Sequence, residues 1–353
     1  MKLPRIAALE GITIPARVQR VLKLSGYPIF YLLCLLLFAY WTFPYDRLRE
    51  RILVELEAQR GNSPTAQHVE IDSLGPYWLS GVTLKGIRLI TPRVLTSEGE
   101  KLPSRLSIDE AHARVSLLPL LIGRVTLNFG AKAFGGRVDG FTRVGSEGRT
   151  IEASLEEVDV GQIETIGNAL GGLPLSGAMN GKLELVLPEQ KLGKANGSIS
   201  LAVTELTAGD GKTKIAGKLS LPKLNVGAFD LEAEAKDGIL RFSKLGAQGQ
   251  DLDLAGEGKL SLREAFGDSL ADLYLRFRFA EGYKNKNELT KSLFGSAGSS
   301  MPALFELADP RIKSSKRPDG YYSWHMTGPL KDARFEPAPT ASSGGGSGAG
   351  RAK

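Results

Sequence analysis

Apolar and polar residues alternate along most of the chain from residue 68 onward. This period of two predicts β-strands that turn one apolar face away from water. The clearest runs cover residues 125–129, 183–187, 199–203 and 273–279. Clusters of glycine with aspartate or lysine, as at 236–238, separate such runs and predict tight turns. The pattern therefore predicts a mainly β fold, an elongated and curled antiparallel sheet with one apolar face.

Helical periodicity is confined to short segments. A leucine or isoleucine recurs every fourth residue over 46–61, which predicts an amphipathic helix. Two further segments, 162–170 and 286–294, are long enough for two turns each. So few helices leave the strands of residues 62–337 to form the body of the protein.

A short repeat accompanies the strands. The sequence Gly-Lys-Leu-x-Leu begins at Gly181, Gly217 and Gly258. Offsets of this size are typical of stacked structural units. The repeat predicts that each copy begins a strand of such a unit.

A long uncharged segment precedes the strands. Residues 24–45 carry no formal charge, and as a helix they would extend about 33 Å, enough to cross a hydrocarbon core of about 30 Å. Aromatic residues flank an aliphatic centre, as in helices whose rings lie at the lipid headgroups. We therefore predict a transmembrane anchor at 26–45, held by Tyr27, Phe30, Leu33, Leu36, Tyr40, Trp41 and Phe43.

The same residues are compared with two alternatives to the anchor, a cleaved signal peptide and a buried core helix. A cleaved signal peptide needs small residues at its cleavage site, whereas the apolar run ends in the bulky sequence Ala39–Phe43. A buried core helix would need other strongly apolar segments to cover it, and the chain has none of comparable hydrophobicity. The uncleaved anchor fits the residues best.

The charge distribution orients this anchor. The net charge is +6, of which +4 lies in residues 1–25. A basic flank stays in the cytoplasm, so we expect 1–25 to be a cytoplasmic tail and the domain at 62–337 to be periplasmic. That domain is almost neutral, which argues against nucleic acid as a partner. Residues 338–353, rich in glycine and serine, predict a flexible tail.

Motifs of catalysis are missing from the sequence. There is no G-x-S-x-G, H-E-x-x-H or C-x-x-C pattern, and the three histidines are isolated in sequence. Cys34, the one cysteine, lies inside the predicted anchor. We therefore expect no catalytic residues, no metal ligands and no cofactor, and a protein that is not an enzyme.

The apolar face of the predicted sheet leaves two interpretations open. It is either the closed core of a sandwich or a groove that binds acyl chains or an extended partner, because both produce the same alternation. The scarcity of long helices favours a sheet that covers itself by curling. The candidate groove residues are Leu201, Val203, Leu252, Leu254, Leu273, Leu275, Phe277 and Phe279.

Several segments together resemble a known family. They are the anchor ending in Phe43–Leu48, the run Gly75–Leu84, the run Ser116–Val125, the turn Ala133–Gly136 and the closing run Met326–Phe335. In this order they are similar to the type II secretion system protein GspN of delta-class proteobacteria. The runs Ser116–Val125 and Met326–Phe335 also resemble segments of AsmA- and TamB-like envelope proteins.

The resemblance implies a location and a role. It implies a single-pass inner-membrane protein with a periplasmic β-groove, acting as a non-enzymatic scaffold or accessory part beside the platform proteins of a type II secretion system. The alternative that it implies is an AsmA- or TamB-like protein that binds or transfers phospholipid. No catalytic residues carry over from either family.

Overall fold

The computed structural model describes most of the chain. It covers residues 26–28, 30–31, 34–35, 37–38, 40–60, 68–91, 94–96, 99–101, 104–120, 123–146, 148–170, 172–215, 219–295 and 303–338. The chain divides into two compact units, Met1–Leu48 and Arg49–Lys353. The predicted tail 1–25, Leu33 and Leu36 of the anchor, and residues 339–353 lie outside the described residues.

The first unit contains the predicted anchor. Its described residues between Gly26 and Thr42 are helical, and Tyr27, Phe30 and Trp41 are exposed. Among the described residues, no helix combines the length and the apolar character that crossing a membrane would require. The transmembrane anchor therefore stays a prediction. The helix α2 (Tyr45–Arg60) follows, where the leucine spacing predicts a helix.

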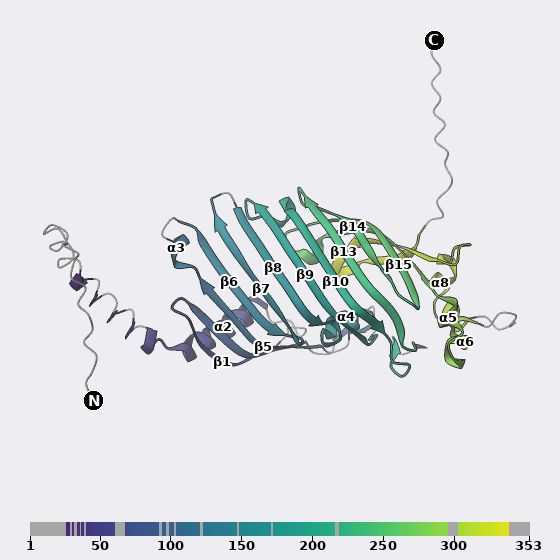
Figure 1. Ribbon diagram of the computed structural model, residues 1–353, viewed down its shortest axis with the longest axis horizontal. Helices are drawn as coiled ribbons and strands as arrows, with labels where there is room; N and C mark the ends of the chain where they lie inside the picture. The colour runs from purple at the N-terminus through teal and green to yellow at the C-terminus, as the bar shows by residue number, and fades with distance from the viewer. Residues whose placement is uncertain are drawn as a thin grey trace, which may run out of the picture. The chain divides into compact units, whose positions relative to one another are not determined.

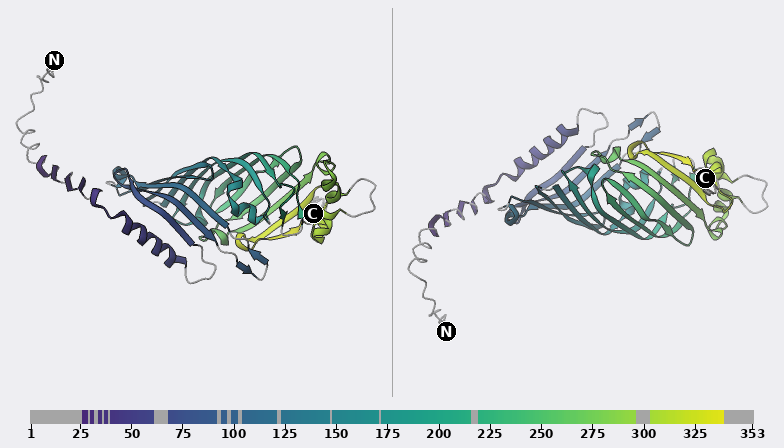
Figure 2. Two further views of the ribbon diagram at one scale, coloured as in Figure 1. Left: turned by 90° about the horizontal axis from the view of Figure 1, so that it is seen from below. Right: turned by 90° about the horizontal axis from the view of Figure 1, so that it is seen from above.

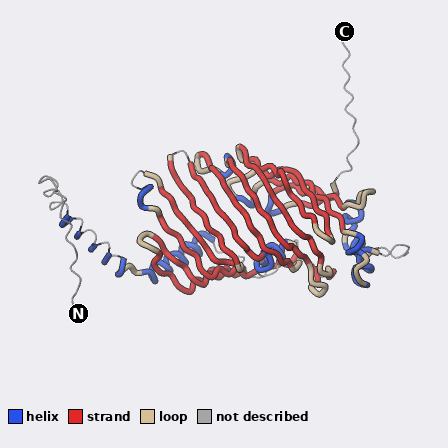
Figure 3. Tube along the Cα trace, viewed as in Figure 1, coloured by secondary structure: helices blue, strands red, loops and turns tan. Residues whose placement is uncertain are grey.

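The second unit is built on one antiparallel sheet of fourteen strands (Figures 1 and 3). Its strands, in spatial order, are β1 (His68–Tyr77), β2 (Gly81–Thr91), β5 (Ser104–Val115), β6 (Val125–Ala133), β7 (Gly136–Gly145), β8 (Gly148–Asp159), β9 (Leu175–Pro188), β10 (Asn196–Ala208), β13 (Leu224–Lys236), β14 (Ile239–Gln248), β15 (Leu252–Ser261), β16 (Leu270–Phe279), β17 (Tyr322–Pro329) and β18 (Arg334–Pro337). Each strand pairs with the next one along the chain, apart from two inserted hairpins. These are β3 (Val94–Thr96) with β4 (Gly99–Lys101), and β11 (Lys214–Ile215) with β12 (Leu219–Ser220).

The mainly β antiparallel fold is thus confirmed, and its strands form a single large sheet. The sheet is open, because β1 and β18 are its two edges. No second layer of strands packs against it among the described residues, so the sandwich alternative does not describe this fold. Figure 2 shows the sheet curved, and Figure 1 shows its last strands passing behind its middle strands.

The curvature has a local cause in the backbone. The pairing register shifts between Leu155 and Val158 in β8, and again between Thr204 and Thr207 in β10. Each shift contains a glutamate with positive φ, Glu157 and Glu205, both at 53°. An extra residue on one strand bends that strand and increases its twist. These bulges therefore help to curl a sheet that would otherwise be flatter.

Short helices cover one end of the strands. The segment between β16 and β17 forms α5 (Glu281–Lys284), α6 (Glu288–Phe294), α7 (Leu304–Ala308) and α8 (Pro310–Ser315). Tyr283 of α5 is fully buried, and its hydroxyl donates a hydrogen bond of 2.6 Å to the carbonyl oxygen of Pro222. Burial raises the pKa of this hydroxyl, so it stays protonated as a donor. The prediction of a helix at 286–294 is confirmed by α6.

The prediction from the short repeat is wrong. Gly181 lies in the middle of β9 and Gly258 near the end of β15, while Gly217 lies outside the described residues. A side chain would not fit at Gly258, because its Cβ would lie 2.2 Å from the carbonyl oxygen of Asp272 on the neighbouring strand. Glycine is needed at position 258 because the neighbouring strand comes close there. The position does not mark the start of a structural unit.

A two-residue turn joins β13 to β14, as the sequence predicts. Asp237 and Gly238 have φ of 49° and 76°, the pair of positive values that a tight hairpin of this type needs. The loop η2 (Leu192–Lys194) lies against this turn. A Cβ on Gly238 would lie 2.0 Å from the carbonyl oxygen of Gly193. The loop at η2 and the turn between β13 and β14 are thus in contact at Gly238, where a larger residue would not fit.

This contact generates a stability prediction. We expect Gly238→Ala to lower the free energy of unfolding by at least about 1 kcal/mol, because alanine is strained at positive φ and meets a backbone oxygen. The matched control is Gly145→Ala, in another hairpin, where a Cβ meets nothing within 4 Å. Urea unfolding followed by circular dichroism measures both. Equal effects of the two substitutions would contradict the assignment.

Candidate apolar binding face

One row of directly paired apolar positions crosses the whole sheet. In strand order its members are Leu74, Leu84, Ala111, Ala131, Val138, Leu155, Gly181, Leu201, Leu231, Leu245, Gly256, Leu275, Trp324 and Pro337. Leu245 and Gly256 are neighbours across a register shift, where the leucine side chain fills the space above the glycine. We call the side of the sheet that carries this row the apolar face.

The opposite side of the sheet is polar. Charged residues of opposite sign lie next to each other across strands, as in the ion pairs Lys132–Glu110 at 3.6 Å and Lys244–Asp230 at 2.9 Å. Such exposed pairs contribute little stability each, but they keep this side compatible with water. The sheet therefore separates an outer polar side from an inner apolar one.

The apolar face is closed at both ends of its C-terminal half. At one end, α5–α8 pack on Val226, Ala247 and Phe279, all buried. At the other end, η2 folds over the strands: Leu192 packs on a buried cluster that includes Leu187 and Leu260. The backbone N–H groups of Leu192 and Gly193 face the Glu264 carboxylate at 3.3 and 3.4 Å.

Between these ends the apolar face is half-buried. Leu127, Leu155, Leu201, Leu231 and Leu275 keep an intermediate exposure although they lie in the interior of a wide sheet. Side chains in a closed core are more deeply buried than this. The middle of the face therefore carries apolar area that no described element of the chain covers.

The predicted groove residues all lie on the apolar face. The register pairs Leu252 with Phe279 and Leu254 with Phe277. The eight divide into two groups by burial. Val203, Leu273 and Phe279 are buried, whereas Leu201, Leu252, Leu254, Leu275 and Phe277 are half-buried. The structure thus brings them onto one surface, part of it core and part of it accessible.

One cation lies on this face, and sequence reasoning missed it. Within the described strands, Arg149 is the charged residue that the register places there, paired with Val144 and Leu187. Among the described residues its buried Nε has no hydrogen-bond partner, and neither does the buried Oγ1 of Thr142, two residues from Val144 on β7. Arg149, Ile151, Ala153 and Leu155 are every second residue of one strand, so their side chains lie on the same face. This spacing is the sequence signal that places Arg149 among apolar residues.

Both edges of the sheet are blunted by arginine. Arg49 donates to the carbonyl oxygen of Asp72 on β1 at 2.9 Å, and Arg311 donates to that of Phe335 on β18 at 3.4 Å. Free edge carbonyls invite another strand to pair, and charged side chains on an edge oppose this. The edges are therefore poorer candidates for a binding site than the apolar face.

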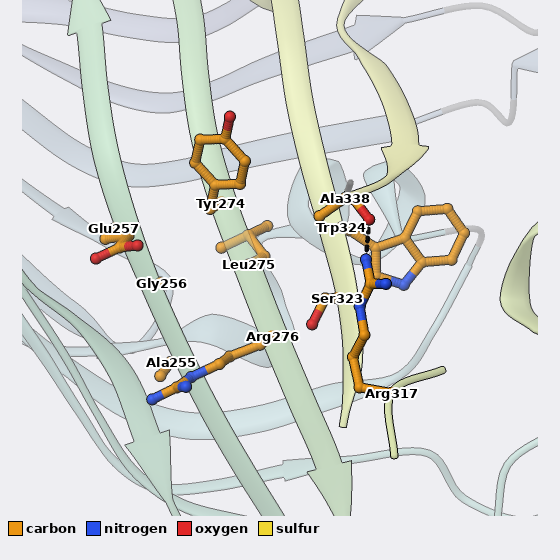
Figure 4. A pocket seen from close by; sticks show the side chains of 10 residues that line it. All are labelled: Ala255, Gly256, Glu257, Tyr274, Leu275, Arg276, Arg317, Ser323, Trp324 and Ala338. Carbon is orange, nitrogen blue, oxygen red and sulfur yellow. Dashed lines mark hydrogen bonds between the residues drawn. The ribbon is translucent and has the colours of Figure 1, made fainter. Parts of the chain in front are cut away.

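A pocket of about 520 Å³ lies over β15–β17 (Figure 4). Its lining includes Ser323 and Glu257, and Figure 4 shows Arg317 hydrogen-bonded to the carbonyl oxygen of Ala338. The lining holds no histidine or cysteine, so it offers no Ser–His or Cys–His pair for nucleophilic catalysis.

His325 lies nearby and has a structural role. Its ring stacks on Tyr274 at 4.1 Å and its Nε2 lies 2.9 Å from Oδ1 of Asp272. This hydrogen bond lowers the pKa of Asp272 below its usual value. Among the described residues, no group of three or more potential metal ligands comes together.

No protein-family model, curated protein or solved structure matches the chain. Its function is therefore argued from its own geometry.

The unpaired cation generates a prediction about stability. We expect Arg149→Met to leave the free energy of unfolding unchanged or to raise it by about 1 kcal/mol, because an apolar side chain replaces a partly buried polar one that lacks a partner. Thermal unfolding in mild detergent measures this. A clear loss of stability would show that Arg149 is needed for the fold itself.

Proposed function

We propose that the apolar face binds the acyl chains of phospholipids in the periplasm, on a protein anchored in the inner membrane. The observation that carries the proposal is the apolar row across all fourteen strands, half-buried in its middle and uncovered by the rest of the described chain. Exposed apolar area of this extent in a soluble domain is typical of a binding surface. Each acyl methylene transferred from water to the face would contribute about 0.8 kcal/mol.

The dimensions of the face suit long chains. Fourteen strands at about 4.8 Å spacing give a surface about 60 Å long measured along the curve. One acyl chain in a bilayer leaflet extends over about 15 Å, half of the hydrocarbon thickness. The face therefore has room for several chains in succession, which favours a lipid over a compact small molecule.

Arg149 is suited to the lipid headgroup. A guanidinium forms paired, charge-assisted hydrogen bonds with a phosphate. Arg149 lies near the start of β8, on the apolar face, and its Nε has no hydrogen-bond partner among the described residues. In the proposed complex it would bind the phosphodiester while the acyl chains lie on the neighbouring leucines.

Adjacent residues on opposite sides of β16 allow a matched test. Native mass spectrometry of the detergent-extracted protein should detect bound phospholipid. We expect Leu275→Glu, on the apolar face, to lower the bound fraction at least about tenfold, since it places a charge against the acyl chains. Tyr274→Glu, on the polar side, should leave that fraction unchanged.

Arg149→Met should also lower lipid retention although it does not lower stability, a combination that a purely structural residue does not produce. Circular dichroism checks that each variant keeps its β-sheet. If the folded wild type never carries lipid, or if Tyr274→Glu has the same effect as Leu275→Glu, the proposal fails.

We further propose that the protein works beside the inner-membrane platform of a type II secretion system, in a non-enzymatic accessory role. The support is the resemblance to GspN in the order of anchor, turn and strand segments. The blunted edges described above indicate that partners would bind elsewhere than by strand addition.

This second proposal has its own test. Affinity purification of the full chain in mild detergent should recover secretion platform proteins from cells that express the system. Deletion of the gene should reduce secretion. Unchanged secretion together with no platform protein in the eluate would contradict it, whatever the outcome for lipid.

A further inference from the structure

Two segments that lie far apart in the sequence meet at one end of the sheet. They are the β1–β2 turn at 78–80 and the short helix α3 (Leu117–Leu120) after β5. The hydroxyl of Ser80 donates to the carbonyl oxygen of Val115 at 2.6 Å, and the N–H of Val115 donates to the carbonyl oxygen of Ser80 at 3.2 Å. Figure 1 shows α3 beyond the end of the strands.

The side chains at this end are large, apolar and exposed. Leu79 and Leu118 are 81% and 80% exposed, and Trp78 is 68% exposed. Leu117 and Leu120 are exposed as well. We call these five residues the apolar tip. Scattered exposed leucines are ordinary, but here a tryptophan and four leucines gather on two segments that the Ser80–Val115 hydrogen bonds bring to the same end of the sheet.

The backbone at Trp78 is strained. Its φ is 51°, in the left-handed region that glycine or asparagine occupies at little cost and that a bulky aromatic residue rarely adopts. Trp78 makes no buried contact that would explain this conformation, because most of its surface faces solvent. Similar φ values occur in the turn at Asp237 and in the bulges at Glu157 and Glu205, so at Trp78 the value belongs to the tight turn between β1 and β2. Here it presents an indole ring outward.

The charge around the apolar tip is positive. The Arg114 guanidinium lies 5.9 Å from the Trp78 ring centre, and Arg124 is exposed just after α3. Residues 76–84 and 113–128 contain no aspartate or glutamate. The two segments therefore combine an amphipathic ring, leucines and arginines, and neither segment contains an acidic residue.

We propose that the apolar tip inserts into the interface of a bilayer that contains anionic phospholipids. Tryptophan prefers the headgroup level of a membrane, leucines enter the acyl boundary, and arginines are attracted to anionic headgroups. The inference does not require lipid on the apolar face, so the two proposals can succeed or fail separately.

The test uses the three tryptophans of the chain, Trp41, Trp78 and Trp324. The full-length double variant Trp41→Phe/Trp324→Phe keeps Trp78 alone. It is reconstituted into phosphatidylcholine vesicles with or without phosphatidylglycerol, and with lipids brominated near the headgroup or near the chain end. We expect a blue-shifted Trp78 emission that headgroup-proximal bromine quenches more strongly than deep bromine, and more strongly still with phosphatidylglycerol present.

Matched leucine variants in the same background test the patch itself. Leu118→Asp should abolish the quenching, and Leu307→Asp, at a leucine of α7 that is also largely exposed, should leave it intact. Trp78 emission typical of exposed indole, insensitive to brominated lipid, would overturn the inference.

The companion variant Trp41→Phe/Trp78→Phe keeps Trp324 on the apolar face. Quenching of Trp324 without quenching of Trp78 would support lipid on the apolar face and would overturn insertion of the tip. Quenching of Trp78 without quenching of Trp324 would support insertion of the tip and would count against lipid on the apolar face.

Discussion

The structure depends on one constraint: a single sheet can bury an apolar face only against something else. Sheets usually meet this constraint with a second layer of strands or helices. Here the short helices and η2 cover only the two ends, and the middle of the face relies on curvature. A row of paired apolar positions from Leu74 to Pro337 is thus held partly open to solvent. In the proposed function, lipid covers this row.

The same constraint accounts for other features of the sheet. A wide sheet with a hydrophobic side has two edges that could pair with other chains, and each edge has an arginine on one of its carbonyl groups, Arg49 on β1 and Arg311 on β18. The polar side is covered by short-range ion pairs of balanced sign. The bulges at Glu157 and Glu205 supply curvature at the expense of regular pairing. Together they oppose strand addition at the edges and keep the polar side compatible with water.

Much of this fold could be predicted from the sequence. The period of two predicted the strands and their faces, because alternation along a strand is a direct consequence of its geometry. Asp237-Gly238 predicted its turn for the same local reason. The eight groove residues fell on one face, as expected, but which of them are closed core depended on distant segments such as α5–α8.

Other features depend on contacts that sequence patterns do not record. Register shifts such as that at Glu157 have no strong local signal in the sequence. The short repeat predicts stacked units, but its glycine at position 258 is needed because two strands approach closely. The apolar tip joins residues 78–80 to 117–120 only through the pairing of β2 with β5. Arg149 lies on the apolar face because of the register of β8 with β7 and β9, which the sequence does not record.

The central claim is that the apolar face carries lipid while the protein works in the cell. Photo-crosslinking measures this directly, with p-benzoyl-phenylalanine placed at Leu231 on the apolar face or at its neighbour Glu232 on the polar side. The account predicts phospholipid crosslinked at position 231 and not at 232. Crosslinks to lipid at neither position, or equally at both, would contradict it.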